Sequence, residues 1–212
     1  MHEGQIAWVD AGRVLAYRTA IELDVAKHHP DAAQRQQANL WCALVTPLLK
    51  ASWTDQAFHG GSDCLQVFGG HGYVREWGIE QIVRDSRVAM IYEGTNEIQA
   101  QDLLFRKVLA DQGAGLLATL GGLEQDLDRL DSAAAVRART GLQQLRELVG
   151  LLQAGGPGVA LQLYPVAGDF LRVVTLTLMA WAWARLDDAG AAVQGGTAFA
   201  RWVWLELAMR QL

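Results

Sequence analysis

Apolar side chains recur at helical spacing from the start of the chain. Over residues 1–28 the apolar positions are separated by three, four or seven residues, which is typical of an amphipathic helix. The positions that define this pattern are Ile6, Val9, Ala16, Ala20 and Leu23. A first helix is therefore predicted here, ending at the sequence His28-His29-Pro30-Asp31.

A second helical pattern runs from Pro30 to about Phe68. Its core stripe consists of Leu40, Ala43, Leu44, Leu48 and Ala51. Proline removes a backbone N–H and clashes with the preceding turn, so Pro47 predicts a kink or a break near Thr46.

Two shorter helical segments follow. Residues 79–90 place apolar side chains at near-helical spacing, and Glu80 and Arg84 stand four residues apart, where they can pair on one face. The turn at residues 92–96 leads into another helix, which Thr95 or Asn96 is expected to cap. This helix is predicted to reach Asp111 and to end at Gly113 and Gly115.

The remaining residues also favour helices. Leucines recur from Gly121 to Ala154, a glycine-rich loop is predicted at residues 155–158, and the apolar run 170–186 predicts a buried helix. Trp181 and Trp183, like Trp202 and Trp204, form WxW pairs that fit a helix enclosed by neighbours. With no clear alternating strand pattern, the prediction is an all-α protein: an up-and-down helical bundle at 1–112 and a helical C-terminal extension at 113–212.

Composition narrows the function classes. The 212 residues are 51% hydrophobic with a formal net charge of −5, which disfavours nucleic-acid binding. We expect no metal site, since the two cysteines and the His28-His29 pair lack ligand spacing. Residues 1–28 do not resemble a signal peptide, and the charge-free run 173–184 is too short to span a bilayer. A cytoplasmic location is expected, with Cys42 and Cys64 reduced and buried.

Polar, turn-forming chemistry concentrates between Gln66 and Gln101. The glycines of the sequence QVFGGHGY would let a bound group approach the backbone directly. Further on, Glu93 stands between Tyr92 and Gly94, just ahead of a helix start. Partial desolvation by Ile91 and Tyr92 would suit this carboxylate to act as a base.

Three motifs in this stretch carry a family resemblance. In order and spacing, QVFGGHGY, GIEQIVRDSR and IYEGTNEIQ resemble the C-terminal helical domain of the acyl-CoA dehydrogenases. In that family the glutamate of the YEGT motif abstracts the α-proton of an acyl-CoA thioester while a β-hydride passes to FAD. The resemblance implies this role for Glu93.

The resemblance also implies binding roles. The residues that fall on the family's contact with the adenosine end of FAD, which is usually bound mainly by a neighbouring subunit, are Gln66, Val67, Phe68, Gly69 and Gly70. Thr95 and Glu97 fall where the family again contacts the flavin cofactor. Tyr92 and Gly94 fall where the acyl thioester lies. A shared cofactor turn implies a homo-oligomer, at least a dimer.

The resemblance covers roughly the last third of a family member. The stretch LVTPLLKASWTDQAF and the C-terminal region resemble the large bacterial subgroup with a C-terminal extension, which is 3-methylmercaptopropionyl-CoA dehydrogenase-like. Family members carry an N-terminal helical domain and a β-barrel before this region, so the chain could be a fragment, the product of a shortened gene or one subunit of a split enzyme. The alternative function is a non-catalytic helical module that dimerises or completes a partner carrying those domains.

Overall fold

The computed structural model describes residues 2–155 and 160–190, and these form only helices and turns. The all-α prediction is therefore confirmed. The α-helices are α1 (His2–His28), α2 (Ala32–Val67), α3 (Ile79–Ala89), α4 (Asn96–Gln101), α5 (Ala114–Leu127), α6 (Ala133–Ala154), α7 (Ala160–Leu163) and α8 (Ala167–Asp188). The shorter elements are η1 (Gly69–Tyr73), η2 (Arg75–Trp77), the π-helix η3 (Asp102–Val108), η4 (Leu109–Asp111) and η6 (Tyr164–Val166).

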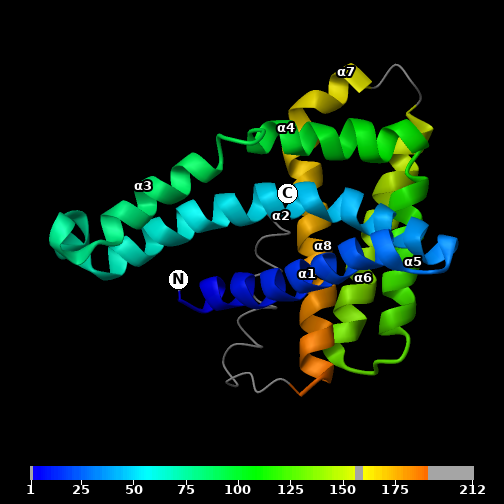
Figure 1. Ribbon diagram of the computed structural model, residues 1–212, viewed down its shortest axis with the longest axis horizontal. Helices are drawn as coiled ribbons and strands as arrows, with labels where there is room; N and C mark the ends of the chain where they lie inside the picture. The colour runs from blue at the N-terminus through cyan, green and yellow to red at the C-terminus, as the bar shows by residue number, and fades with distance from the viewer. Residues whose placement is uncertain (1, 156–159, 191–212) are drawn as a thin grey trace.

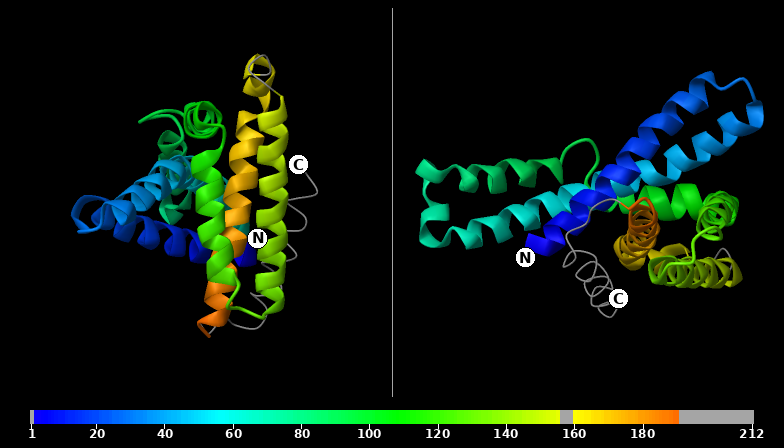
Figure 2. Two further views of the ribbon diagram at one scale, coloured as in Figure 1. Left: turned by 90° about the vertical axis from the view of Figure 1, so that its right-hand side faces the viewer. Right: turned by 90° about the horizontal axis from the view of Figure 1, so that it is seen from below.

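The helices form two groups that cross. In Figure 1, α1 and α2 run antiparallel, and α3 folds back along the C-terminal half of α2 to form a projecting hairpin. Helices α5, α6 and α8 stand side by side as the second group, as Figure 2 shows. Because α8 also packs against α1, α2 and α4, helices from both sides of residue 112 share one hydrophobic core.

The buried face of α1 differs from the predicted one. Val9 and Leu23 are each 46% exposed, and Ala16 and Ala20 are also exposed. The buried positions instead recur every four residues, at Ala7, Ala11, Leu15 and Thr19. Small side chains at these positions let α1 lie close to α2 and α8, so close approach decides the buried face rather than the largest apolar residues.

The predicted break in the second helix is wrong, because α2 continues without interruption through Pro47. Pro30, by contrast, stands just before its start. Pro30 precedes the N-cap residue Asp31, whose side chain accepts a hydrogen bond from Ala33 N at 2.9 Å. Leu44 and Leu48 on either side of Pro47 are fully buried, so tertiary packing holds the helix across the missing backbone donor.

Helix α8 is the core helix of the second group, as predicted. Trp181 and Trp183 are 4% and 0% exposed, so opposite faces of the helix are both covered. By length and composition, residues 164–188 could also cross a membrane, but 72% of the most apolar window is buried within the described structure. The predictions for residues 156–158 and for the terminal helix, including Trp202 and Trp204, lie outside the described residues.

The junction between the two predicted halves contains a left-handed residue. Gly113, with a φ of +76°, precedes α5, whereas Gly115 lies inside α5 and does not end a helix. Two acidic side chains of α5 are paired: Glu124 bonds Arg146 of α6 at 2.7 Å, and Asp126 meets Arg18 of α1 at 3.4 Å. These pairs tie α5 to both groups of helices.

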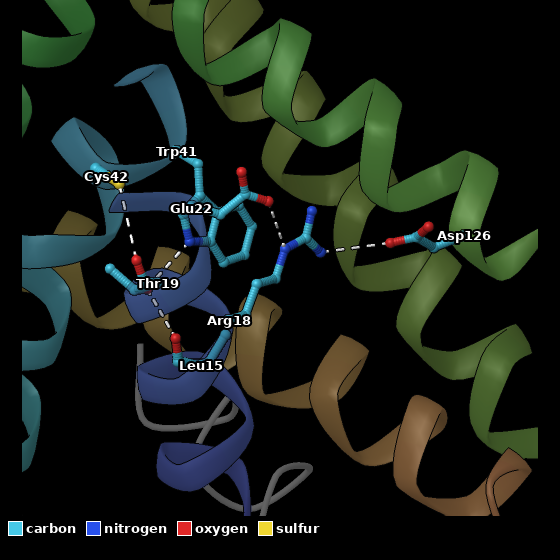
Figure 3. Close-up of polar contacts among 7 residues, drawn as sticks. All are labelled: Leu15, Arg18, Thr19, Glu22, Trp41, Cys42 and Asp126. Carbon is cyan, nitrogen blue, oxygen red and sulfur yellow. Dashed lines mark hydrogen bonds and ion pairs between the residues drawn. The ribbon is translucent and has the colours of Figure 1, made fainter. Parts of the chain in front are cut away.

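The two cysteines differ in environment. Cys42 is buried beside Thr19, as Figure 3 shows, and its thiol lies 3.9 Å from the Thr19 carbonyl. Burial, with the nearby Glu22 carboxylate, raises the pKa of the Cys42 thiol. Cys64 is exposed, so the prediction that both thiols are buried is wrong for this one. It lies on the C-terminal half of α2, which forms the projecting hairpin with α3.

Candidate functional site

Glu93 lies on a tight turn between α3 and α4. Its φ is +55°, and the next residue, Gly94, has a φ of +87°, so two consecutive residues adopt left-handed conformations. A left-handed conformation is uncommon for a glutamate. Glycine, at position 94, adopts it readily because it has no β-carbon. Thr95 then caps α4, accepting a hydrogen bond from Ile98 N at 3.3 Å, which settles the capping residue.

Side chains hold this turn from two directions. The ammonium of Lys50, on α2, donates to the Gly94 carbonyl at 2.6 Å and to Asn96 Oδ1 at 3.0 Å. From α4, Gln99 Nε2 donates to the Glu93 carbonyl at 3.3 Å. The backbone carbonyls of both left-handed residues are therefore occupied by side-chain donors.

Sequence reasoning assigned no function to Lys50. The sequence feature that could have drawn attention to it is its place inside an apolar stretch of α2, between Leu49 and Ala51. An exposed face would not be expected there. Asn96 completes the connection, because its Nδ2 donates to the Ala51 carbonyl at 3.1 Å. Burial lowers the pKa of Lys50, and the Glu93 carboxylate opposes that effect.

The Glu93 side chain is exposed on the described surface. Its neighbours Ile91 and Tyr92 are each 52% exposed, so they do not shield the carboxylate from water as the sequence suggested. Within the described residues, the carboxylate therefore lies open to water.

A groove of about 380 Å³ lies beside the N-terminus of α4. Glu97 lines it, together with Asn96, and is the predicted flavin contact that faces this groove. The groove also contains Arg172 of α8 and His59 of α2, which lies 3.7 Å from Asp55. Thr95 and Glu97 both lie within four residues of Glu93, but Glu97 lines the groove whereas Thr95 caps α4.

The predicted adenosine contacts lie at the other end of α3. Gln66, Val67, Phe68, Gly69 and Gly70 are all exposed where α2 ends and η1 begins. Gly69 has a φ of +58°, and a β-carbon added at either glycine would have no atom within 4 Å. The turn therefore presents open backbone that a flat or elongated ligand could approach, which fits contact with one end of a cofactor.

The structure separates the two sets of predicted residues. The 11 residues of α3 lie between the glycine turn and Glu93, which at 1.5 Å per residue corresponds to about 16 Å. The two ends of α3 are therefore two separate surface sites in a single chain.

Within the described parts of the chain, no group of three or more His, Cys, Asp or Glu side chains is placed to hold a metal ion.

Known proteins are similar in sequence to the region that contains both sites. The family described as acyl-CoA dehydrogenase, C-terminal domain, matches residues 6–107. The chain is 44% identical over 107 residues to 3-methylmercaptopropionyl-CoA dehydrogenase of Ruegeria pomeroyi, a match that covers 50% of this chain and 18% of that protein. It is 31% identical over 203 residues to the broad-specificity linear acyl-CoA dehydrogenase FadE5 of Mycobacterium tuberculosis, covering 89% of this chain and 33% of that protein.

A solved structure shares the fold. Caenorhabditis elegans ACDH-11, determined in complex with C11-CoA, aligns with a TM-score of 0.69 at 22% identity, over 92% of this chain and 33% of that one. The matches to FadE5 and ACDH-11 cover 89% and 92% of this chain, so both extend well past residue 107. The chain matches at most a third of the length of any of these three proteins.

Proposed function

We propose that residues 6–107, which match the acyl-CoA dehydrogenase C-terminal domain, contribute the catalytic base of an acyl-CoA dehydrogenase. The reaction is oxidation of an acyl-CoA thioester between its α and β carbons. The observation that carries the proposal is Glu93, a carboxylate presented outward on a turn whose backbone is fixed from both sides. The 44% identical relative from Ruegeria pomeroyi is named for this class of reaction.

Glu93 acts on the α-carbon. Its carboxylate accepts the α-proton, which the adjacent thioester carbonyl makes acidic, and becomes a carboxylic acid. The electron pair left on the α-carbon forms the new double bond as hydride leaves the β-carbon. FAD, when bound, supplies the acceptor for that hydride. Tyr92 and Gly94, on either side of the base, are placed to contact the thioester.

The residues at both ends of α3 fit contacts to FAD. The open backbone of Gly69 and Gly70 permits close approach of the cofactor's adenosine end, with Gln66, Val67 and Phe68 beside it. Thr95 and Glu97, near the base, are the second set of contacts. Because the two sets lie at opposite ends of α3, we propose that two copies of the chain share the cofactors, which requires at least a dimer.

The test is Glu93→Gln in an assembly that holds bound FAD and this chain. The amide cannot accept the α-proton, so turnover of an acyl-CoA should fall by about 10²- to 10⁴-fold while the flavin absorbance is retained. Glu147→Gln is the matched control, since Glu147 is also exposed but lies on α6, outside the residues proposed to bind substrate or flavin. Near-normal turnover by the Glu93 variant would remove this residue from the mechanism.

A second candidate function is a non-catalytic helical module that completes a partner. The projecting hairpin favours it, because large apolar side chains there are exposed: Val67, Phe68, Tyr73, Val74, Trp77, Ile82, Val88, Ile91 and Tyr92. An absorbance spectrum of the purified chain with added FAD separates the two. Bound flavin that bleaches with an acyl-CoA supports the dehydrogenase, whereas no flavin binding by the chain alone supports the module.

A further inference from the structure

We propose that Lys50 is a positioning residue that fixes the direction of the Glu93 carboxylate by clamping the turn on which it lies. The proposal rests on the function proposed for Glu93. The Lys50 ammonium contacts the backbone carbonyl of Gly94 and the side chain of Asn96. It therefore acts on the reaction only by placing another side chain, that of Glu93.

The backbone of the turn needs such support. A left-handed conformation is sterically unfavourable for an L-residue, and Glu93 adopts it although it carries the β-carbon that glycine lacks. An unsupported turn would relax to other conformations and carry the carboxylate with it. Here the Gly94 carbonyl is held by a charged donor at 2.6 Å, a short distance for an N–H···O hydrogen bond.

The ammonium also ties the turn to the middle of α2. Lys50 projects from the middle of α2, between the fully packed residues Leu48 and Ala51. Asn96 accepts from Lys50 and donates to the Ala51 carbonyl, so the start of α4 is bound to one turn of α2 at two points. Movement of Glu93 relative to α2 would break several hydrogen bonds together.

Burial and the nearby carboxylate act in opposite directions on the charge of Lys50, and burial has the larger effect. Burial lowers the pKa of Lys50, and the Glu93 carboxylate opposes that effect, so the two charges are close enough to interact. The remaining hydrogen bond to the turn, from Gln99 to the Glu93 carbonyl, is a neutral one at 3.3 Å. The charged contact is therefore the stronger of the two side-chain supports.

The first experiment measures the turn in the 212-residue chain and does not depend on activity. Hydrogen exchange by NMR reports the amides of Asn96 and Gln99, which are bonded to the carbonyls of Met90 and Thr95. Lys50→Met keeps the apolar stem and removes the donors, so these amides should exchange about 10- to 100-fold faster than in the original chain.

Two further variants make the result specific. Lys50→Arg keeps the charge and several donors, so it should restore most of the protection. Lys107→Met, on η3, is the control for loss of a half-buried lysine and should leave the turn unchanged. If Lys50→Met does not fold, Asn96→Ala removes one acceptor of the same ammonium and takes its place. Unchanged exchange in the Lys50 and Asn96 variants would overturn the clamp, whatever Glu93 does.

The second experiment measures kcat and KM in the flavin-loaded assembly. A displacement of about 1 Å at a reacting group costs about 100-fold, so Lys50→Met should lower kcat by about that factor with little change in KM. Lys50→Arg should recover most of the activity. If Glu93→Gln is inactive while Lys50→Met turns over normally, the clamp does not position the base. If Glu93→Gln stays active, the function proposed for Glu93 fails and the exchange result alone decides the clamp.

Discussion

The indole Nε1 of Trp183 donates a hydrogen bond to the Ala7 carbonyl at 3.1 Å, joining residues 176 positions apart. Trp183 lies on α8 and is fully buried, and Ala7 lies on the buried face of α1. A second bond in the same region joins the hydroxyls of Ser52 and Thr175 at 2.8 Å. The C-terminal helices therefore complete the core that α1 and α2 begin.

Replacing Trp183 should destabilise the whole chain. Trp183→Ala removes a fully buried ring and leaves the Ala7 carbonyl without this donor, so the free energy of unfolding should fall by about 3–5 kcal/mol. Trp77→Ala is the control, because Trp77 is 53% exposed and should change the value by less than about 1 kcal/mol. Urea denaturation measures both. Two separate unfolding transitions, only one of them shifted by Trp183→Ala, would contradict a shared core.

Arg18 should contribute more to stability than its surface position suggests. Its guanidinium lies 3.9 Å from the ring centre of Trp41 and 4.8 Å from that of Trp181, and it pairs with Glu22 and Asp126. Figure 3 shows it between Glu22 and Asp126, beside Trp41. Arg18→Met should lower the free energy of unfolding by about 1–3 kcal/mol, since stacking on two rings adds to the ion pairs.

The control for Arg18 is a shorter ion pair in a more exposed place. Arg84 bonds Glu80 at 2.8 Å on α3, but its side chain is 64% exposed. Arg84→Met should therefore change the free energy of unfolding by less than about 1 kcal/mol. Equal effects of the two substitutions would mean that the aromatic contacts of Arg18 add nothing to its ion pairs.

The two thiols should react with Ellman's reagent at different rates. Cys64 is exposed and should react within minutes at pH 8, whereas Cys42 should react only when the chain is unfolded or at higher pH. Burial and Glu22 raise the pKa of Cys42, so its reactive thiolate forms later as pH rises. Cys64→Ser isolates the slow thiol. Rapid labelling of Cys42 in that variant would show that its environment opens readily.

The same pKa shift fixes the sign of a stability change. The Cys42 thiol holds its proton more tightly in the folded chain than in the unfolded one, where its pKa is about 8.5. The free energy of unfolding that this tighter proton binding contributes is fully present below a pH equal to the unfolded pKa. It is lost as pH rises through the higher pKa of the folded chain. The free energy of unfolding should therefore fall less steeply with alkaline pH in Cys42→Ala than in the original chain.

Much of the fold could be predicted from the sequence because it depends on local patterns. The spacing of apolar residues indicated α1, α2 and α3, and the composition of residues 170–186 indicated the buried helix α8. The buried face of α1 could not be predicted, since it depends on how closely α2 and α8 approach Ala7 and Ala11. The continuity of α2 through Pro47 likewise depends on packing partners that are distant in sequence.

The candidate site could be predicted only in part. The position of Glu93 on a turn before a helix start follows from Gly94 and the capping residue Thr95, both visible in the sequence. Its support by Lys50 could not be predicted, because a contact across 44 residues leaves no local pattern. The exposure of Glu93 also differs from the expectation, since the neighbours Ile91 and Tyr92 face outward in the described structure.

Two of the glycines with proposed roles, Gly94 and Gly70, should respond differently to alanine. Gly94 has a φ of +87°, and a β-carbon there would lie 2.9 Å from Gln99 Nε2, so Gly94→Ala should lower the free energy of unfolding by about 1–2 kcal/mol. Gly70 has open space around its added β-carbon, so Gly70→Ala should change stability by less than about 1 kcal/mol. Thermal and urea denaturation measure both effects.

The same pair separates a backbone requirement from a binding requirement. If the glycine turn contacts FAD through its backbone, Gly70→Ala should weaken flavin binding in the assembled enzyme although the chain remains as stable as before. A β-carbon at Gly70 has open space around it within the described structure, so a loss of flavin affinity would report contact with the bound molecule. A fully stable variant with unchanged flavin affinity would remove Gly70 from the proposed cofactor contact.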